Sequence, residues 1–210
     1  MNAERRWVLA SGNRGKLEEL RALLRAAELD LEVIAQTELG IGAAPEDGAT
    51  FEENALAKAR HAARAAGLPA IADDSGLVVG ALGGAPGVRS ARYAGENADD
   101  GANVSKLLAA LASVPDGQRT ARFICVLAAV ASATDEAPLI ATGEWAGEIA
   151  RAPAGASGFG YDPVFYDPEL GKTAAELPAA VKNRVSHRGQ AMRALVAALR
   201  ALDRPRMDAV

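Results

Sequence analysis

Two neighbouring carboxylates inside an apolar stretch are the side chains of this chain best suited to catalysis. Asp73 and Asp74 lie between Ile71-Ala72 and Leu77-Val78-Val79. A carboxylate of this kind can hold a magnesium ion or take a proton from water. Adjacent residues of a regular strand point to opposite faces. Either the strand breaks here, or one carboxylate does the chemistry while local hydrogen bonds hold the other. A plain turn is the alternative, but the apolar flanks favour a functional break inside a core strand.

A second candidate is the stretch Ser11-Gly12-Asn13-Arg14-Gly15-Lys16, between an apolar strand at 7–10 and an amphipathic helix predicted from about residue 16. Such a turn aims backbone N–H groups and the positive end of the helix dipole at one point, where phosphate binds. Lys16 adds a positive charge. It is not a Walker A loop, because two residues rather than four separate its glycines and Leu17 replaces the magnesium-binding Ser or Thr. An ordinary glycine-containing turn is the alternative.

Polar side chains also gather before and on a second predicted helix. Either Glu46 or Asp47, in the preceding loop, can provide a second magnesium ligand, although most acidic loops are merely solvated. On the helix, Asn54, Lys58 and His61 form a polar stripe. Such a stripe usually faces water, and His61 is expected at the surface. Lys58 can reach a phosphate if the helix lines a cleft.

Aromatic residues are scarce, and four of the nine lie between residues 159 and 166. The glycines on either side of Phe159 let the backbone approach a flat ligand, on which the ring can stack. Asp162 can accept hydrogen bonds from base N–H groups. Residues 164–166 are predicted to form a core strand.

The last polar group, Lys182, Ser186, His187 and Arg188, surrounds the start of the final helix. Ser186 is a natural N-cap. Cations in a first turn oppose the helix dipole, which an anion or an electron-rich carbonyl docked there would offset. The alternative is that both His187 and Arg188 bend into solvent.

The elements that must position these residues alternate between strand and helix. Thr50 with Glu53 forms a capping box at the start of the second helix. Apolar spacing predicts helices at about 16–28, 50–67, 101–112 and 187–202, and strands at about 7–10, 31–35, 77–82, 121–131 and 138–149. The two long strands are expected to be antiparallel neighbours. The pattern predicts an α/β fold with a mixed central β-sheet flanked by helices.

Length and composition limit the classes of protein. The 210 residues fit one domain, or two lobes around a shared cleft. We expect a single domain over 1–202 and a flexible tail over 203–210. The net charge of −4 argues against a nucleic-acid partner or a membrane surface, and Cys125 is expected to fill the core. With no apolar run of membrane-spanning length and no secretory signal, a cytoplasmic protein is expected.

Together these segments resemble the inosine triphosphate pyrophosphatase family, also called dITP/XTP pyrophosphatases. Glu46 stands where the family has its metal carboxylate. The similarity runs in one order along nearly the whole chain, through the loop at 11–16, GATFEENA at 48–55, ADDSGL at 72–77, GGAPGV at 83–88, SARY at 90–93, GFGYDP at 158–163 and SHRG at 186–189.

The resemblance implies a Mg²⁺-dependent homodimer with a nucleotide-binding cleft. It would hydrolyse the purine nucleoside triphosphates ITP, dITP and XTP to monophosphate and pyrophosphate, cleansing the nucleotide pool. Asp74 would accept the proton of the water that attacks the α-phosphorus, and Glu46 and Asp74 would bind the metal. The residues implied for the triphosphate are Ser11, Gly12, Asn13, Arg14, Gly15, Lys16 and Lys58; those implied for the rest of the nucleotide are Ser75, Phe159, Gly160, Tyr161, Asp162, Lys182, His187 and Arg188.

Three alternatives remain at this stage. A Maf-like pyrophosphatase for modified pyrimidine or 7-methylguanosine triphosphates is disfavoured by the Phe159 loop and the His187-Arg188 pair. A non-catalytic nucleotide sensor is disfavoured because it needs no proton acceptor such as Asp74. A nucleic-acid-binding module fits the acidic charge balance least well.

Overall fold

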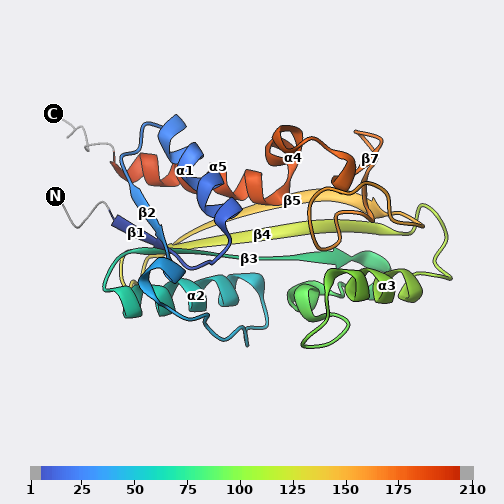
Figure 1. Cartoon of the computed structure of the whole chain (residues 1–210), viewed down its shortest axis with the longest axis horizontal. Coiled ribbons are helices and arrows are strands. Elements are labelled where there is room, and N and C mark those ends of the chain that lie inside the picture. The colour runs from blue at the N-terminus through green and yellow to red at the C-terminus, as the bar shows by residue number, and fades with distance from the viewer. Residues whose placement is uncertain (1–5, 204–210) are drawn as a thin grey trace. The chain divides into compact units, whose positions relative to one another are not determined.

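The computed structural model describes residues 6–203 as a seven-stranded sheet with helices on its faces (Figure 1). The strand order is β2-β1-β3-β4-β5-β6-β7. The strands are β1 Arg6–Leu9, β2 Glu32–Ala35, β3 Ala70–Val79, β4 Thr120–Val130, β5 Leu139–Ile149, β6 Phe165–Asp167 and β7 Lys172–Thr173. The helices are α1 Arg14–Ala26, α2 Phe51–Ala66, α3 Asp100–Ala110, α4 Ala179–Val185 and α5 His187–Asp203.

The pairing of the strands confirms the predicted mixed sheet. β1 runs parallel to β2 and β3, whereas β6 runs antiparallel to β5 and β7. The long strands β4 and β5 are neighbours, as predicted. The short helix α4 was not predicted. The predicted tail lies, from residue 204 on, outside the described residues.

The chain divides into two compact units, each described here by itself. The first unit comprises the described residues within 1–74, 126–142 and 191–210, and the second comprises 75–125 and 143–190. One boundary falls within β3, between Asp74 and Ser75. The predictions of a single domain over 1–202 and of a cleft stay predictions. No helix among the described residues has the length and apolar character that crossing a membrane requires.

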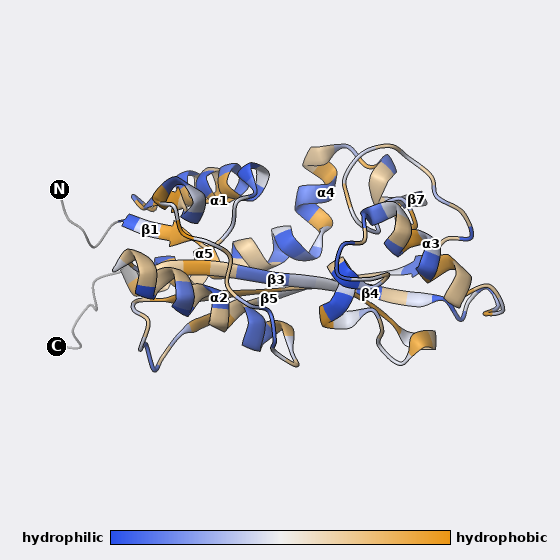
Figure 2. Ribbon diagram, turned by 60° about the horizontal axis from the view of Figure 1, so that its bottom comes forward, coloured by the Kyte–Doolittle hydropathy of each residue, from blue (hydrophilic) through white to orange (hydrophobic). Residues whose placement is uncertain are grey.

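Two helices of the first unit start at caps that fix the neighbouring loops. α1 begins at Arg14, two residues before the predicted start, because the Asn13 side chain accepts a hydrogen bond from the backbone N–H of Lys16 at 3.2 Å. Figure 2 shows hydrophobic and hydrophilic residues alternating along α1. At α2, Thr50 Oγ1 accepts a hydrogen bond from the backbone N–H of Glu53. The Glu53 carboxylate in turn accepts one from the backbone N–H of Ala49, which confirms the capping box.

The second unit packs around aromatic side chains. The ring of Phe123 lies 4.5 Å from that of Phe165 and 6.4 Å from that of Trp145, between centroids. Fully buried leucines of α3 and β3 join this cluster. The prediction that Cys125 lies in the core is confirmed, since its side chain is buried.

β3 is the element that carries the two central carboxylates. The predicted break at these residues is wrong, because β3 is continuous from Ala70 to Val79. Figure 2 shows a hydrophilic segment in the middle of this strand. Asp73 and Asp74 are both buried there, 5% and 7% exposed. A continuous strand can bury both because each finds a cationic partner from a distant part of the chain.

Candidate active site

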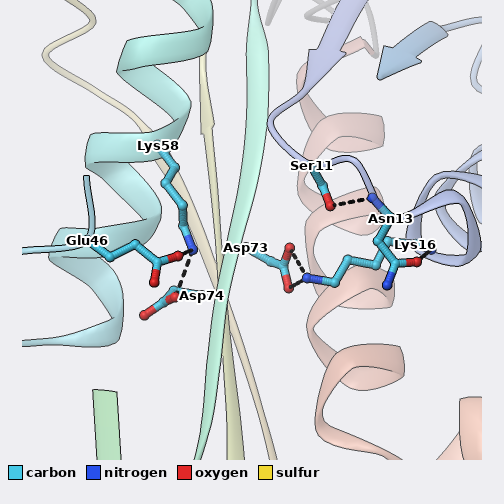
Figure 3. A network of polar contacts seen from close by, with 7 residues as sticks. All are labelled: Ser11, Asn13, Lys16, Glu46, Lys58, Asp73 and Asp74. Carbon is cyan, nitrogen blue, oxygen red and sulfur yellow. Dashed lines mark hydrogen bonds and ion pairs between the residues drawn. The ribbon is translucent and has the colours of Figure 1, made fainter. Parts of the chain in front are cut away.

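The regular alternation of β3 sends its two carboxylates to opposite sides of the strand (Figure 3). Asp73 faces Lys16 of α1, whose Nζ lies 2.8 Å from each carboxylate oxygen. Asp74 faces α2 and pairs with Lys58, Nζ to Oδ1 at 2.7 Å. The alternative that local hydrogen bonds alone hold the second carboxylate is therefore corrected. Asp73 is held by a lysine 57 residues away and not only by local hydrogen bonds.

The Asp74 side of β3 holds a cluster of four polar side chains. Lys58 Nζ donates to Glu46 Oε1 at 2.9 Å as well as to Asp74, so two carboxylates share one ammonium. Asn54 Nδ2 donates to the other oxygen of Asp74, Oδ2, at 3.2 Å. The expectation that the polar stripe of α2 faces water is wrong for its first two members. Asn54 is buried and the Lys58 side chain is 14% exposed.

The electrostatics of this cluster favour a charged lysine and a more basic carboxylate. Burial raises the pKa of Asp74, and the nearby ammonium of Lys58 offsets only part of that rise. Burial alone would lower the pKa of Lys58, but attraction to Asp74 and Glu46 outweighs it, and the pKa of Lys58 is raised. A buried carboxylate with a raised pKa accepts a proton more readily than an ordinary aspartate near neutral pH.

The same residues fit a magnesium ion. Carboxylate oxygens are ligands that Mg²⁺ prefers, and one or two of them suffice when water and substrate phosphates complete the coordination. Oxygens of Glu46 and Asp74 already converge on one cation, the ammonium of Lys58. The described residues contain no group of three or more His, Cys, Asp or Glu side chains that could hold a metal ion. Asp47 is exposed, so Glu46 is the better placed of the two predicted alternatives.

The predicted phosphate loop is a tightly hydrogen-bonded turn leading into α1. Ser11 Oγ accepts from the backbone N–H of Asn13 at 3.1 Å, and Asn13 caps the helix at Lys16. The first turn of α1 carries no acidic residue of its own that would oppose an anion. Gly12 is exposed, and a Cβ added to it would lie 3.1 Å from the Thr37 methyl group. Arg14, Gly15 and Lys16 belong to the helix rather than to the loop.

In the second unit, the exposed ring of Phe159 lies near two cations. Lys182 Nζ lies 5.3 Å and Arg188 Cζ 5.4 Å from the ring centroid. Asp162 accepts a hydrogen bond from the backbone N–H of Phe159 at 2.8 Å and also pairs with Lys182. Gly158 has φ +83°, and a Cβ there would come 2.1 Å from Asp162 Oδ2, so this turn requires glycine. The Phe159 ring is 55% exposed and has a face to offer a planar ligand.

Other predicted side chains of this group are buried. Tyr161 donates its hydroxyl hydrogen to the carbonyl of Ser90 at 2.8 Å, and burial raises its pKa. The His187 ring stacks on Phe123 with centroids 4.7 Å apart. The alternative that His187 and Arg188 both bend into solvent is therefore wrong. Ser186 Oγ accepts from Gly189 N–H, which confirms the predicted N-cap.

The structure thus brings the predicted residues together in two groups, one in each unit. In the first unit, Lys16 meets Asp73, and Glu46, Lys58 and Asp74 form one cluster. In the second unit, Asp162, Lys182 and Arg188 lie against Phe159, whereas the side chains of Tyr161 and His187 pack elsewhere. Ser75 is half-buried on β3, directly after Asp74.

Sequence reasoning gave no role to two residues that support these groups: Asn54, which it named only as part of the polar stripe, and Asp100. Asn54 contacts Asp74, and its spacing of four residues from Lys58, one turn of helix, was the available signal. The carboxylate of Asp100, at the start of α3, accepts from the backbone N–H of Gly160 at 2.6 Å. No local pattern links Asp100 to a loop 60 residues away.

Comparison with known proteins gives one consistent answer. A model described as the Ham1 family matches residues 7–198. A dITP/XTP pyrophosphatase of Yersinia pseudotuberculosis is 61% identical over 92% of this chain and 97% of the relative. One from Escherichia coli O157:H7 is 58% identical over the same shares. Among solved structures, a HAM1 protein from Coxiella burnetii is 52% identical with a TM-score of 0.88, covering 92% of this chain and 98% of that one.

Proposed function

Because this chain belongs to the Ham1 family, we propose that it is a nucleoside triphosphate pyrophosphatase that acts on ITP, dITP and XTP. It releases pyrophosphate and the monophosphate, and so cleanses the nucleotide pool. Relatives 58–61% identical are named dITP/XTP pyrophosphatases, which supports the reaction. The observation that carries the proposal is the cluster in which Glu46 and Asp74 share one cation beside a buried asparagine.

Asp74 is the proposed catalytic residue. It takes a proton from a water molecule as the water oxygen forms a bond to the α-phosphorus and the bond to the departing pyrophosphate breaks. Glu46 and Asp74 are the proposed ligands of Mg²⁺, which when bound would neutralise phosphate charge. The raised pKa of Asp74 supports its role as proton acceptor.

The triphosphate is assigned to the first unit. Lys16 and Lys58 supply positive charge, and the N-terminus of α1 supplies backbone N–H groups, those of Arg14 and Gly15. Ser11, Gly12 and Asn13 shape this turn. Both lysines are held by carboxylates in the described structure, so substrate binding requires each ammonium to exchange or share its partner.

The purine is assigned to the second unit. Phe159 stacks on the base, while Lys182 and Arg188 present hydrogen-bond donors only. Donors suit the 6-oxo group of inosine and xanthosine, whereas the amino group of adenine would leave them unpaired. Tyr161 and Gly160 are proposed to contribute through their backbone, because the Tyr161 side chain is buried. Ser75, Asp162 and His187 complete the proposed set.

The same proposal covers the cofactor, the assembly and the location. Mg²⁺ is the proposed cofactor, a homodimer the proposed assembly, and the cytoplasm, where nucleoside triphosphates are made and used, the proposed location. Light scattering coupled to size-exclusion chromatography tests the assembly; a monomer over the working concentration range contradicts it.

One assay tests the proposed reaction. The protein is incubated with Mg²⁺ and ITP, dITP, XTP, dGTP or ATP, and the phosphorus products are identified. We expect pyrophosphate with a preference for ITP, dITP and XTP; release of orthophosphate, or a preference for ATP, contradicts the proposal. Asp74→Asn should nearly abolish turnover while the triphosphate still binds, and unchanged turnover would remove Asp74 from the mechanism.

A further inference from the structure

Asn54 connects the Asp74 carboxylate to the loop that carries Glu46. Its Oδ1 accepts a hydrogen bond from the backbone N–H of Gly48 at 2.8 Å, and its Nδ2 donates to Asp74 Oδ2 at 3.2 Å. The residue lies in the first turn of α2 and is 1% exposed. One amide therefore joins the loop that carries Glu46 to the strand that carries Asp74.

The orientation of this amide follows from its partners. A backbone N–H can only donate, so the atom that faces Gly48 must be the amide oxygen, and the NH₂ group must face Asp74. With Oδ2 of Asp74 held in this way, the other oxygen, Oδ1, is the one directed at Lys58. The carboxylate is thus fixed in rotation as well as in position.

The loop before α2 is shaped to fit this asparagine. A Cβ on Gly48 would lie 2.7 Å from Asn54 Oδ1 and 2.9 Å from the Cβ of Glu53, so no larger residue fits. The adjacent N–H of Ala49 is bound by the Glu53 carboxylate at 2.7 Å. The backbone amides of Gly48 and Ala49, two and three residues after Glu46, are therefore both held by side chains at the start of α2.

We propose that Asn54 is a positioning residue for the metal-binding carboxylates: it orients Asp74 and holds the Glu46 loop at the distance that a shared cation requires. The role of these carboxylates rests on the proposed function, but the positioning itself is a property of the free protein. Partners of this kind, which hold a ligand without touching the metal, affect metal affinity or activity by about 10–100-fold.

The chain offers a matched control in Asn103 of α3. Asn103 is 2% exposed; its Oδ1 accepts from the N–H of Ala94 at 2.7 Å, and its Nδ2 donates to the carbonyl of Ala91 at 3.1 Å. Asn54→Ala and Asn103→Ala therefore remove the same group from the same kind of buried helical site. Only Asn54→Ala takes one of its two hydrogen-bond donors from Asp74, a proposed metal ligand.

The test compares these variants by calorimetric titration of Mg²⁺ into the free protein, by kcat and KM for ITP, and by thermal unfolding. We expect Asn54→Ala to weaken Mg²⁺ binding and lower kcat, each by about 10–100-fold, with a smaller change in KM. Asn103→Ala should lower Tm comparably but leave both quantities near wild type. Equal changes in the two variants, or an unchanged Mg²⁺ affinity in Asn54→Ala, would overturn the proposal.

An exchange of side chains tests the contact without relying on activity. Asn54→Asp sets two carboxylates against each other and should lower Tm, whereas adding Asp74→Asn restores a donor and acceptor pair and should recover it. Recovery of Tm in the double variant supports the contact. If Tm does not recover, Asn54 has a purely structural role. The same conclusion follows if neither the single nor the double variant folds while Asn103→Ala does. If the wild type releases no pyrophosphate from ITP, the proposed function fails, and the Mg²⁺ and Tm measurements still decide the role of Asn54.

Discussion

Removing the ammonium of Lys58 should make the free protein bind magnesium more tightly. Its Nζ lies 2.9 Å from Glu46 Oε1 and 2.7 Å from Asp74 Oδ1, the oxygens proposed to bind the metal. The ammonium and the metal ion therefore compete for the same ligands. The raised pKa of Lys58 keeps the side chain charged at neutral pH, so the competition operates under assay conditions.

The size of the effect follows from the ion pairs that magnesium must displace. The side chains of Lys58 and Asp74 are 14% and 10% exposed, whereas that of Glu46 is 36% exposed. An exposed ion pair contributes about 0.2–1 kcal/mol to stability, and breaking a buried one costs about 3–5 kcal/mol. The contribution of these partly buried pairs lies between the two. About 1 kcal/mol for each of the two pairs gives about 2 kcal/mol, or about a 30-fold change in the dissociation constant.

The assay is calorimetric titration of Mg²⁺ into nucleotide-free Lys58→Met and wild-type protein. We expect binding about 30-fold tighter in the variant. Its Tm should be lower without metal, because two carboxylates are left without their cation, and should rise with added Mg²⁺.

Lys16→Met is the matched control, because Lys16 pairs with Asp73 on the other side of β3 (Figure 3). It should leave the Mg²⁺ affinity of the free protein unchanged. Equal or weaker Mg²⁺ binding by Lys58→Met would refute the reasoning.

Three further predictions concern other residues. Hydrogen bonds from the backbone N–H groups of Ala131 and Ala137 lower the pKa of Asp135, so its stabilising effect should be present above about pH 4 and lost as pH falls further; a carboxyl titration above the usual range, followed by NMR, contradicts this. Tyr161→Phe removes the hydroxyl that binds a buried carbonyl, and should cost about 1–3 kcal/mol in urea unfolding. The kcat of Tyr161→Phe should change little; a large loss of kcat would indicate that the Tyr161 side chain contacts the substrate. Phe159→Leu should raise KM for ITP about 5–150-fold, the equivalent of about 1–3 kcal/mol of stacking, and an unchanged KM argues against stacking.

Local sequence signals predicted most of the architecture. The capping box at Thr50 and Glu53 marked the start of α2, and apolar spacing located both long strands of the mixed sheet. The short helix α4 escaped prediction because seven residues hold too few turns for a periodic pattern.

The candidate site was predicted by residue type rather than by contact. Asp73 and Asp74 both looked like turn formers, because local propensity takes no account of lysines 57 and 16 residues away. Tyr161 lies between two predicted ligand residues, yet its side chain turns into the core to meet Ser90, 71 residues earlier. Alternation of side chains along β3 is local; it offered opposite-facing aspartates as one of two alternatives, and the favoured one, a break in the strand, is wrong.

That alternation also limits which changes of length β3 can accept. Deleting or inserting one residue just before Asp73 would rotate every following side chain to the other face and exchange the surroundings of the two aspartates. Lys16 would then face Asp74, and Lys58 would face Asp73, with charges balanced as before and the fold's ion pairs intact in number. One aspartate would still face Glu46 and Asn54, but the fully buried side chains of Leu77 and Val79 would turn away from their core. Deep insertion and deletion scanning should therefore find single-residue length changes here more damaging to activity than substitutions at most neighbouring positions.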